Sequence, residues 1–454
     1  MKFNNINADM TKGNLWKQML IFSLPLILSN LVQVLFNMAD LAVVGRFCGA
    51  NALGSVGSTS ILVNLFIGFI IGVSGGINVL VARAKGAKNG MDASNTVLTS
   101  FFLSLVLGLL LSAIGIGFSK IILDDAMNTK PDLLQGALLY FRIFMLGMPA
   151  LTIFNWGNAV LSSVGETKKP LYFLSIAGVL NVILNIIFVL CFGMSTDGVA
   201  FATIISQYVS ATLVVCELVR TKDEDIKLCF SKFKIGAKKV KELAAICLPS
   251  GLQNAIFFFA NIFVQIGVNS FDTVMVAGNS AASNADGIVY DVMAAIYVAI
   301  SSFVGQNYGA GNKKRVLKSF FVGMVYSVLA GLILGVGLVI FGNGFLSLFV
   351  EEKHVIDAGM QKLVVMGLSY WISAFMDGTI AASRGLGRSV VPMYIVFGGS
   401  CVFRLLWIFT VFEYFGTIES LYLLYSASWT ITAVAEIIYF VYVFKKDVKN
   451  GLMQ

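Results

Sequence analysis

The chain contains few of the residues that soluble enzymes use for catalysis or metal binding. It has one histidine, six cysteines and six prolines among 454 residues. His354 falls in a predicted loop and no two cysteines form a CxxC pair, so a metal-ligand cluster is not supported. The sequence also lacks a Walker phosphate loop, a GxSxG motif and an HExxH motif. We therefore expect neither ATP hydrolysis nor common hydrolase chemistry, and no metal or other cofactor.

Charged residues are equally scarce, and their scarcity predicts an all-α membrane protein. They make up 12% of the chain, whereas a soluble domain carries about 25%. Hydrophobic residues make up 57%, and the mean hydropathy is +0.85. Apolar runs of about 20 residues, long enough to cross a bilayer, recur through the chain. They predict twelve transmembrane helices near residues 15–44, 52–81, 94–119, 134–163, 171–192, 198–220, 242–267, 274–305, 316–343, 357–383, 391–412 and 420–444.

The lysines and arginines gather in alternate predicted loops, which indicates the orientation of the chain. Segments facing the cytoplasm carry the excess of basic residues in membrane proteins, so both termini are predicted to be cytoplasmic. With that orientation the outer segments hold only Arg46, Lys120, Lys130, Arg142, Lys353 and Lys362. The formal net charge of +8 arises from this bias, and nucleic acid is not an expected partner.

The two halves of the chain repeat each other. Asn30 and Asn37 recur as Asn254 and Asn261, each 224 positions later. An even number of helices in each half makes the two copies parallel, and duplicated membrane proteins place their binding site between the copies. The predicted units are an N-lobe at 1–220, a basic cytoplasmic linker at 221–241 and a C-lobe at 242–454.

Asp40 is the only acid in the first predicted helix. An ionisable group in the membrane costs roughly 2.5–3.5 kcal/mol, so it needs a partner, a wet cavity or a function. Amides can hydrogen-bond a carboxyl group in either protonation state, which suits a residue that gains and loses a proton. The amides expected near Asp40 are Gln33, Asn37, Asn155, Asn158, Asn181 and Asn185. The alternative is that Asp40 lies near the outer end of its helix and meets water.

The second half carries its ionisable residues at other positions. Asp286 and Asp291 are about 140° apart around the eighth predicted helix, so we do not expect them to share surroundings. Arg404 lies in the middle of the eleventh helix, where we expect it to pair with an acid. Asp377 on the tenth helix is either a cavity residue or the structural partner of Arg404. The candidates for the substrate cavity are Asp286, Asp291, Arg404, Phe257 and Phe258, the last two as an aromatic wall for flat cations.

Together these residues resemble the multidrug and toxic compound extrusion (MATE) family of secondary transporters. The resemblance covers about residues 12–445. The motifs that carry it are LPLILSNLVQVLFNMADLAVVG in the first helix, GAKN and GQNYGAGN after the second helix of each half, NAVLSSVGETKKP after the fourth helix and DGTIAASRGLGRSVVP after the tenth. Their order, the twelve predicted spans and the duplication make the resemblance specific.

The resemblance implies two pseudo-symmetric six-helix lobes in a V shape, which export organic cations in exchange for inward H+ or Na+. It makes Asp40 the coupling residue of the N-lobe. Gln33, Asn158 and Asn181 fall on the family positions that hydrogen-bond to this acid. The next neighbour is an Asp in proton-type members but is Asn185 here, so the proton-type site is only partly present.

The resemblance also bears on the coupling ion through the C-lobe. Sodium-type members combine an acid on helix 7 with an acid on helix 10. Asp377 matches the helix 10 position, whereas the helix 7 position falls in Phe257–Phe259, which leaves that sodium site incomplete. We therefore favour H+ as the coupling ion, with Na+ as the alternative, and predict Asp40 and Asp377 as the two cation-coupling residues.

The sequence thus predicts a secondary active antiporter rather than an enzyme. We expect a monomer in the inner membrane of a bacterial cell, surrounded by lipid, with small organic cations as its substrates. The alternative is a flippase for a lipid-linked or amphipathic precursor of the cell envelope. That function would predict more helices or a cationic groove, whereas this chain has twelve predicted spans and one arginine in the middle of a span.

Overall fold

The computed structural model describes residues 9–127, 129–230 and 236–453, and within these ranges it is built from helices without β-strands. The α-helices are α1 Leu15–Val43, α2 Ala50–Gly86, α3 Gly90–Lys120, α4 Pro131–Leu146, α5 Met148–Ser163, α6 Lys168–Ile186, α7 Thr196–Arg220, α8 Ala237–Val268, α9 Thr273–Gly309, α10 Lys313–Leu346, α11 Lys353–Gly367, α12 Tyr370–Gly385, α13 Val390–Val396, α14 Phe403–Trp407, α15 Glu413–Phe415 and α16 Ile418–Lys449. Short π-helices are η1 Val44–Cys48, η2 Ile121–Ala126, η3 Ile187–Cys191, η5 Phe397–Val402 and η6 Ile408–Phe412. The all-α membrane fold predicted from the sequence is confirmed.

Two of the twelve predicted spans are bent in the structure. Ten described helices are long and apolar enough to cross a membrane, and two bent helix pairs bring the number to as many as twelve. The span predicted at 134–163 breaks at Gly147 into α4 and α5, which meet at 46°. Pro149 in the first turn of α5 lacks an N–H donor and explains why the helix restarts there. The span predicted at 357–383 breaks in the same way into α11 and α12, which meet at 50°.

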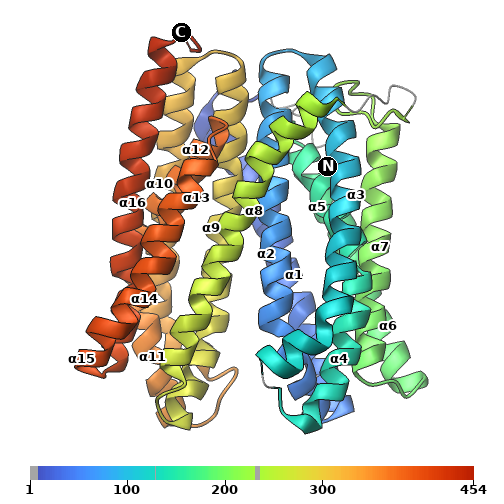
Figure 1. The fold of residues 1–454 in the computed structure, drawn as a ribbon, viewed down its shortest axis with the longest axis vertical. Helices are drawn as coiled ribbons and strands as arrows, with labels where there is room; N and C mark the ends of the chain where they lie inside the picture. The colour runs from blue at the N-terminus through green and yellow to red at the C-terminus, as the bar shows by residue number, and fades with distance from the viewer. Residues whose placement is uncertain (1–8, 128, 231–235, 454) are drawn as a thin grey trace.

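The helices form two groups that stand side by side (Figure 1). We call α1–α7 the N-lobe and α8–α16 the C-lobe. The lobes meet mainly where α2 packs against α8 and α9. The predicted linker at 221–241 lies partly outside the described residues. In its described part, Lys85 at the end of α2 forms ion pairs with Asp223 at 2.8 Å and with Asp225 at 2.6 Å, so this segment is held against the N-lobe.

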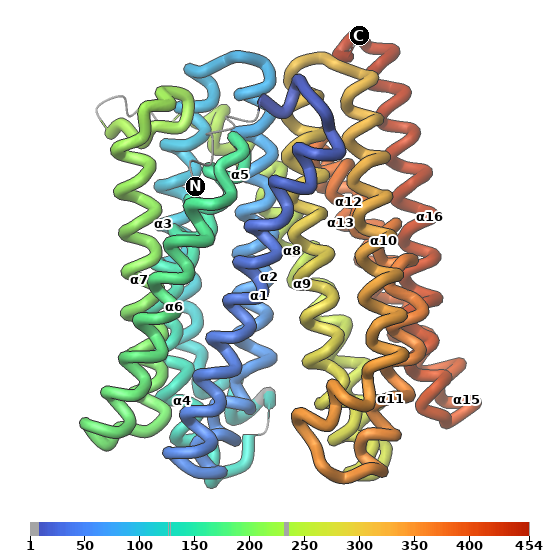
Figure 2. The backbone as a smooth tube through the Cα atoms, turned by 180° about the vertical axis from the view of Figure 1, so that it is seen from behind, coloured from blue at the N-terminus to red at the C-terminus, as the bar shows by residue number. Residues whose placement is uncertain are grey.

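Helix α1 crosses from one lobe to the other along its length. Figure 2 shows it running obliquely between the two groups, and it packs against α9 and α10 as well as against α6. Its first half places Met19, Phe22 and Leu26 in the hydrophobic core of the C-lobe. Its second half reaches the N-lobe, where the Phe36 ring packs directly against Gly178 of α6. Pro25 lies within the first half, where it removes a backbone hydrogen bond and makes bending easier.

The segment before α1 is fastened to the C-lobe by Arg315 at the start of α10. The guanidinium group donates to the carbonyl oxygens of Met10 at 2.9 Å, Lys12 at 2.6 Å and Gly13 at 2.9 Å. The amide of Asn307 also donates to the Met10 carbonyl at 3.1 Å, and the Met10 side chain is fully buried. The described beginning of the chain is therefore an ordered part of the contact between the lobes.

We expect Arg315→Gln to release this segment. Several charge-assisted hydrogen bonds disappear, each worth about 1.5–3 kcal/mol when partly buried, so backbone amides of residues 11–18 should exchange with solvent roughly tenfold faster or more. Hydrogen exchange followed by mass spectrometry measures this directly. The matched control is Lys318→Gln, one turn further along α10 and exposed. Equal protection of the segment in the two variants would contradict the role of Arg315 in holding it.

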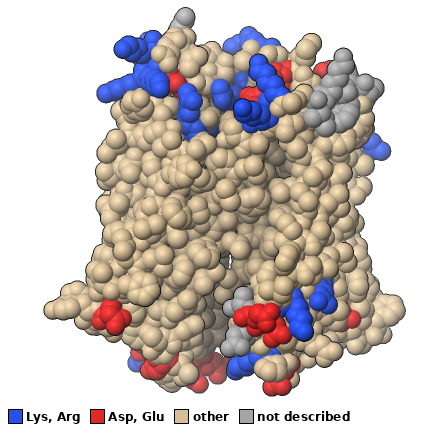
Figure 3. All heavy atoms as spheres, in the orientation of Figure 1, with Lys and Arg blue, Asp and Glu red and all other residues tan. Residues whose placement is uncertain are grey.

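The basic residues gather at one end of the molecule. Figure 3 shows most visible lysines and arginines at the end that carries the C-terminus, separated from the other end by a broad uncharged belt. Met10 contacts Asn307 there, and Asp447 accepts a hydrogen bond from the Tyr308 hydroxyl at 3.0 Å, so both described chain ends lie together. We call this the terminal end and the opposite one the distal end. The same view shows the lobes parted toward the distal end.

Candidate functional site

Asp40 lies in a closed ring of hydrogen bonds inside the N-lobe. The Asn185 amide donates to Asp40 Oδ1 at 2.5 Å and to Asn181 Oδ1 at 3.3 Å. The Asn181 amide donates to Thr203 Oγ1 at 3.4 Å, and the Thr203 hydroxyl shares its single proton between the Val199 carbonyl at 2.9 Å and Asp40 Oδ2 at 3.3 Å. The ring joins α1, α6 and α7, and it gives the Asp40 carboxylate two donors. The side-chain oxygen Oδ1 of Asn185 is buried and has no hydrogen-bond partner among the described residues.

The local sequence explains why these groups meet. Asn181 and Asn185 are four residues apart on α6, so they lie on one face of that helix, and both are buried. Gly178, one turn earlier, has no side chain, and the Phe36 ring of α1 occupies the space that a Cβ atom would fill. This close contact brings α1 against the asparagine face of α6. The π-helix η1 begins shortly after Asp40, and π-helices occur often at functional sites.

Four amides predicted near Asp40 are not bonded to it. Gln33 and Asn37 are exposed on α1, and Asn158 on α5 accepts a hydrogen bond from the Ser162 hydroxyl at 3.3 Å. Asn155 donates to the carbonyl of Leu151, within its own helix. Since an amide exposed to lipid is costly, the exposure of Gln33 and Asn37 indicates that this face of α1 meets water between the lobes.

Thr203 is the member of the ring that the sequence did not reveal. It is an ordinary threonine within α7, and only the rotation of α7 against α1 and α6 brings it to Asp40. We expect Thr203→Val to slow transport by roughly three- to tenfold, because the isosteric valine leaves Asp40 Oδ2 without a donor. Transport rates in proteoliposomes measure the effect. Thr212→Val is the matched control on the outer face of the same helix, and an equal loss in both variants would contradict a specific role for Thr203.

The C-lobe buries a second carboxyl cluster around Asp377. Glu436 on α16 is fully buried, and both of its carboxylate oxygens lack a partner among the described residues. Asp377 and Arg384 on α12 are close enough to Glu436 to interact with it electrostatically. Arg384 also reaches the seam between the lobes, where its guanidinium donates to Gln253 Oε1 at 3.4 Å. The structure thus adds Glu436 and Arg384 to the surroundings of Asp377.

Asp286 and Asp291 have different surroundings, as the 140° spacing predicts. Asp286 accepts a hydrogen bond from the Tyr370 hydroxyl at 2.6 Å. The buried ammonium group of Lys362 interacts electrostatically with Asp286 and donates to Ser283 Oγ at 2.7 Å. The side chain of Asp291 is half-buried on another face of α9, and its backbone carbonyl accepts from the Asn30 amide of the N-lobe at 2.8 Å.

The prediction that Arg404 pairs with an acid is wrong. Its guanidinium group donates to Asn261 Oδ1 at 2.7 Å and to Ser428 Oγ at 3.3 Å. The guanidinium carbon lies 4.7 Å from the centre of the Tyr425 ring. Among the described residues no carboxylate lies within salt-bridge distance of Arg404. The π-helices before and after α14 shift the register of this span, which a regular helical pattern cannot predict.

The two predicted aromatic residues of α8 lie near the seam between the lobes. Phe258 packs against α2, where its ring occupies the space beside Gly68 that a Cβ atom would need. Phe257 packs against the hydrophobic core of the C-lobe. Both side chains are half-buried. Phe258 therefore helps to join the lobes in this state, and Phe257 lies beside it on the C-lobe.

The lobes are tightly closed at the terminal end through backbone contacts. A Cβ atom added to Gly86 would lie 1.9 Å from the carbonyl oxygen of Gln306, and one added to Gly309 would lie 2.0 Å from that of Arg83. The Gln306 amide also donates to the carbonyl of Ser163 in the N-lobe at 2.7 Å. The lobes are therefore in direct backbone contact at the terminal end, whereas they are parted toward the distal end (Figure 3).

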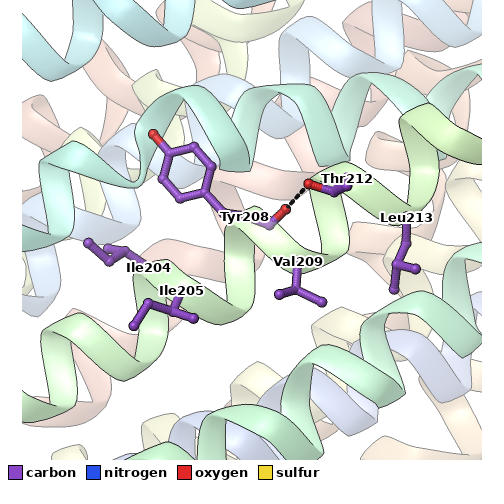
Figure 4. Close-up of a pocket in the computed structure, with 6 residues that line it drawn as sticks. All are labelled: Ile204, Ile205, Tyr208, Val209, Thr212 and Leu213. Atoms are coloured by element: carbon purple, nitrogen blue, oxygen red, sulfur yellow. Dashed lines mark hydrogen bonds between the residues drawn. The ribbon is translucent and has the colours of Figure 1, made fainter.

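A groove on the outer face of α7 is a poor candidate for the substrate site. It has a volume of about 380 Å³ and is lined by Ile204, Ile205, Tyr208, Val209, Thr212 and Leu213 (Figure 4). Its polar groups are already engaged, since the Tyr208 hydroxyl donates to the Leu146 carbonyl at 3.0 Å and the Thr212 hydroxyl to the Tyr208 carbonyl at 2.7 Å. Such an apolar outer surface suits contact with lipid.

Comparison with known proteins gives one consistent result. The model of the MatE family matches residues 25–187 and 249–410, one segment in each lobe. The chain is 28% identical over 397 residues to the probable multidrug resistance protein YpnP of Bacillus subtilis, which covers 86% of this chain and 87% of the relative. It is 26% identical over 410 residues to the probable multidrug resistance protein NorM of Thermotoga maritima. That match covers 88% of this chain and 86% of the relative.

A solved structure shows the same fold. The structure described as the outward-facing conformation of a multidrug resistance MATE family transporter superimposes with a TM-score of 0.89. The sequences are 20% identical, and the match covers 98% of this chain and 99% of the other. These descriptions do not favour the alternative of a flippase for cell-envelope precursors.

Proposed function

The chain belongs to the MatE family of membrane transporters, and from this premise we propose that it is a secondary antiporter that exports organic cations in exchange for H+. As a family member it is a multi-pass membrane protein that moves small organic compounds, not an enzyme. The observation that carries the proposal is the ring around Asp40, which holds one carboxyl group among two amides and a hydroxyl inside the N-lobe. This arrangement suits a group that exchanges a proton.

The ring offers hydrogen bonds to both protonation states of Asp40. As a carboxylate, Asp40 accepts from Asn185 and Thr203. As a carboxylic acid, it needs an acceptor for its new O–H group. The unpartnered Asn185 Oδ1 atom is such an acceptor next to Asp40, and a rotation of the amide would present it. The rotated amide accepts the proton of Asp40 and gives up its hydrogen bond to Asn181 Oδ1, so the ring has a partner for each protonation state of Asp40, which supports H+ over Na+.

The closed terminal end and parted distal end correspond to one step of an alternating-access cycle. In this state the cavity would open to the outside, where a proton binds Asp40 and the exported compound leaves. Closure at the distal end and opening at the terminal end would then release the proton to the cytoplasm. The two ligands must oppose each other with a coupling free energy on the order of 1–3 kcal/mol. We propose the bacterial inner membrane as the location, with both termini in the cytoplasm.

The test is efflux from a host that lacks its own drug pumps. Cells that make the protein should accumulate less ethidium than cells with an empty vector, and dissipating the proton gradient should abolish the difference. A panel of cations of different shape would define the substrate range. If accumulation is equal in both strains for every compound, export of organic cations is refuted.

A further inference from the structure

The last turns of α16 carry basic residues at the terminal end. Lys445, Lys446 and Lys449 are all exposed, and none of them forms an ion pair with another described residue. The acid of the same stretch, Asp447, is fully buried and accepts a hydrogen bond from the Tyr308 hydroxyl at 3.0 Å, so it points into the protein. Figure 3 shows a group of basic residues over this end of α16, beside the C-terminus. Within the part of the chain that the structure describes, these three charges are not neutralised.

The three lysines border a hollow in the surface. Basic residues are expected here for general reasons, because cations stabilise the C-terminal end of a helix and lysines gather at the cytoplasmic ends of membrane spans. Neither reason requires a space between the side chains. Tyr442, Lys445, Lys446, Lys449 and Asn450 nevertheless line a hollow of about 430 Å³, within the range of about 300–1,000 Å³ that is typical of small-molecule sites. The charges therefore surround a space that a ligand can enter.

The side chains around this hollow suit an anion with several oxygen atoms. Each lysine ammonium group offers N–H donors, Tyr442 adds a hydroxyl and Asn450 adds an amide, and none of the five lining side chains is acidic. The Lys446 ammonium lies 5.9 Å from the centre of the Tyr442 ring, so the ring lies beside the charges. A phosphate group can accept from several of these donors at once, whereas a cation would be repelled.

An exposed apolar strip runs along α16 into the hollow. Ile431, Val434, Ile438 and Tyr442 follow one another at spacings of three or four residues, so they lie on one face of the helix, and all four are exposed. Lys445 continues this face one turn later. Figures 1 and 2 place α16 at the outer edge of the C-lobe, where an apolar face suits contact with lipid. A molecule with an anionic head and apolar chains would cover the hollow and the strip together.

We propose that this hollow binds the headgroup of an anionic phospholipid, whose acyl chains lie along the apolar strip of α16. The lipid comes from the leaflet at the terminal end, where anionic headgroups attract lysine clusters. A soluble phosphate compound would use the same charges but would leave the strip uncovered, so the continuity of hollow and strip favours a lipid. The inference is independent of the exported compound and of the coupling ion.

The experiment compares two lipids that share their acyl chains. Dioleoylphosphatidylglycerol carries a net negative charge and dioleoylphosphatidylcholine carries none, and native mass spectrometry measures the binding of each to the purified full-length protein in detergent. We expect the wild type to bind the anionic lipid at least about tenfold more tightly. The triple variant Lys445→Gln, Lys446→Gln, Lys449→Gln should lose this preference and leave the affinity for the neutral lipid unchanged. Glutamine is a good helix former, so α16 should be retained.

Two controls separate a lipid site from general attraction between charges. The triple variant Lys222→Gln, Lys238→Gln, Lys241→Gln removes three exposed lysines outside the hollow and should preserve the preference of the wild type. An equal loss in both triple variants would overturn the proposed site. Glycerol 3-phosphate, a phosphate headgroup without acyl chains, should not displace the anionic lipid, and displacement would show a site for soluble phosphates instead. Equal affinity of the wild type for both lipids would also refute the inference, whether or not the variants fold.

Discussion

Asp40→Asn should lower the rate of transport driven by a proton gradient by about a hundredfold or more, while the protein still folds. Asparagine has nearly the same shape and can still accept from Thr203, so the packing of α1 against α6 and α7 is retained. Asparagine cannot bind a proton, so the outward-open and inward-open states no longer differ in protonation. The proton gradient then cannot drive the transport of substrate. The measurement is uptake of ethidium into proteoliposomes under an imposed pH gradient.

The expected pattern also distinguishes coupling from substrate binding. Asp40→Asn should still exchange labelled for unlabelled substrate when no gradient is present, because that exchange needs no net proton movement. The matched control is Asp357→Asn on α11, the same change at an exposed carboxylate. Gradient-driven uptake by Asp40→Asn at the wild-type rate would refute a coupling role for this residue.

Gly86→Ala combined with Gly309→Ala should displace the protein from the conformation described above. Each added methyl group would meet the backbone of the facing helix at about 2 Å, and backbone cannot rotate away as a side chain can. Overpacking of this kind costs about 1–3 kcal/mol per site, so the closed terminal end should lose at least tenfold in population. We expect the distance between spin labels placed on α2 and α9 at the terminal end to increase, and transport to fall strongly.

Gly57→Ala is the matched control for this prediction, because it lies on the same helix α2 but has no atom within 4 Å of the added Cβ atom. It should leave both the distances and the transport rate unchanged. If the double variant keeps the short distance at the terminal end, the close approach of α2 and α9 is not what seals that end.

The sequence predicted the asparagine face of the N-lobe site because the signal is local. Asn181 and Asn185 are one helical turn apart in an apolar run, and helical geometry alone places them on one face. Thr203 gave no such signal, since threonine is common in transmembrane helices and its contact with Asp40 depends on how α7 is rotated. Gln33 and Asn37 share a helix with Asp40, yet both are exposed and neither is hydrogen-bonded to the ring.

The C-lobe was harder to predict because its contacts depend on irregular helices. The span with Arg404 alternates between α- and π-helix, and each π-turn rotates the following residues relative to a regular helix. A buried arginine without a partner is costly, but here the amide of Asn261 and the ring of Tyr425 contact the guanidinium of Arg404 instead of an acid. The burial of Glu436 without a hydrogen-bond partner among the described residues also emerged only from the packing of α16.

The most direct test of the account is to record ethidium and proton fluxes together in proteoliposomes that contain the wild-type protein. An imposed pH gradient should move ethidium against its own concentration gradient, and protons should move in the opposite direction at the same time. Neither flux should occur with Asp40→Asn. Ethidium movement that follows a sodium gradient and ignores the pH gradient would contradict proton coupling, and no movement under either gradient would contradict antiport itself.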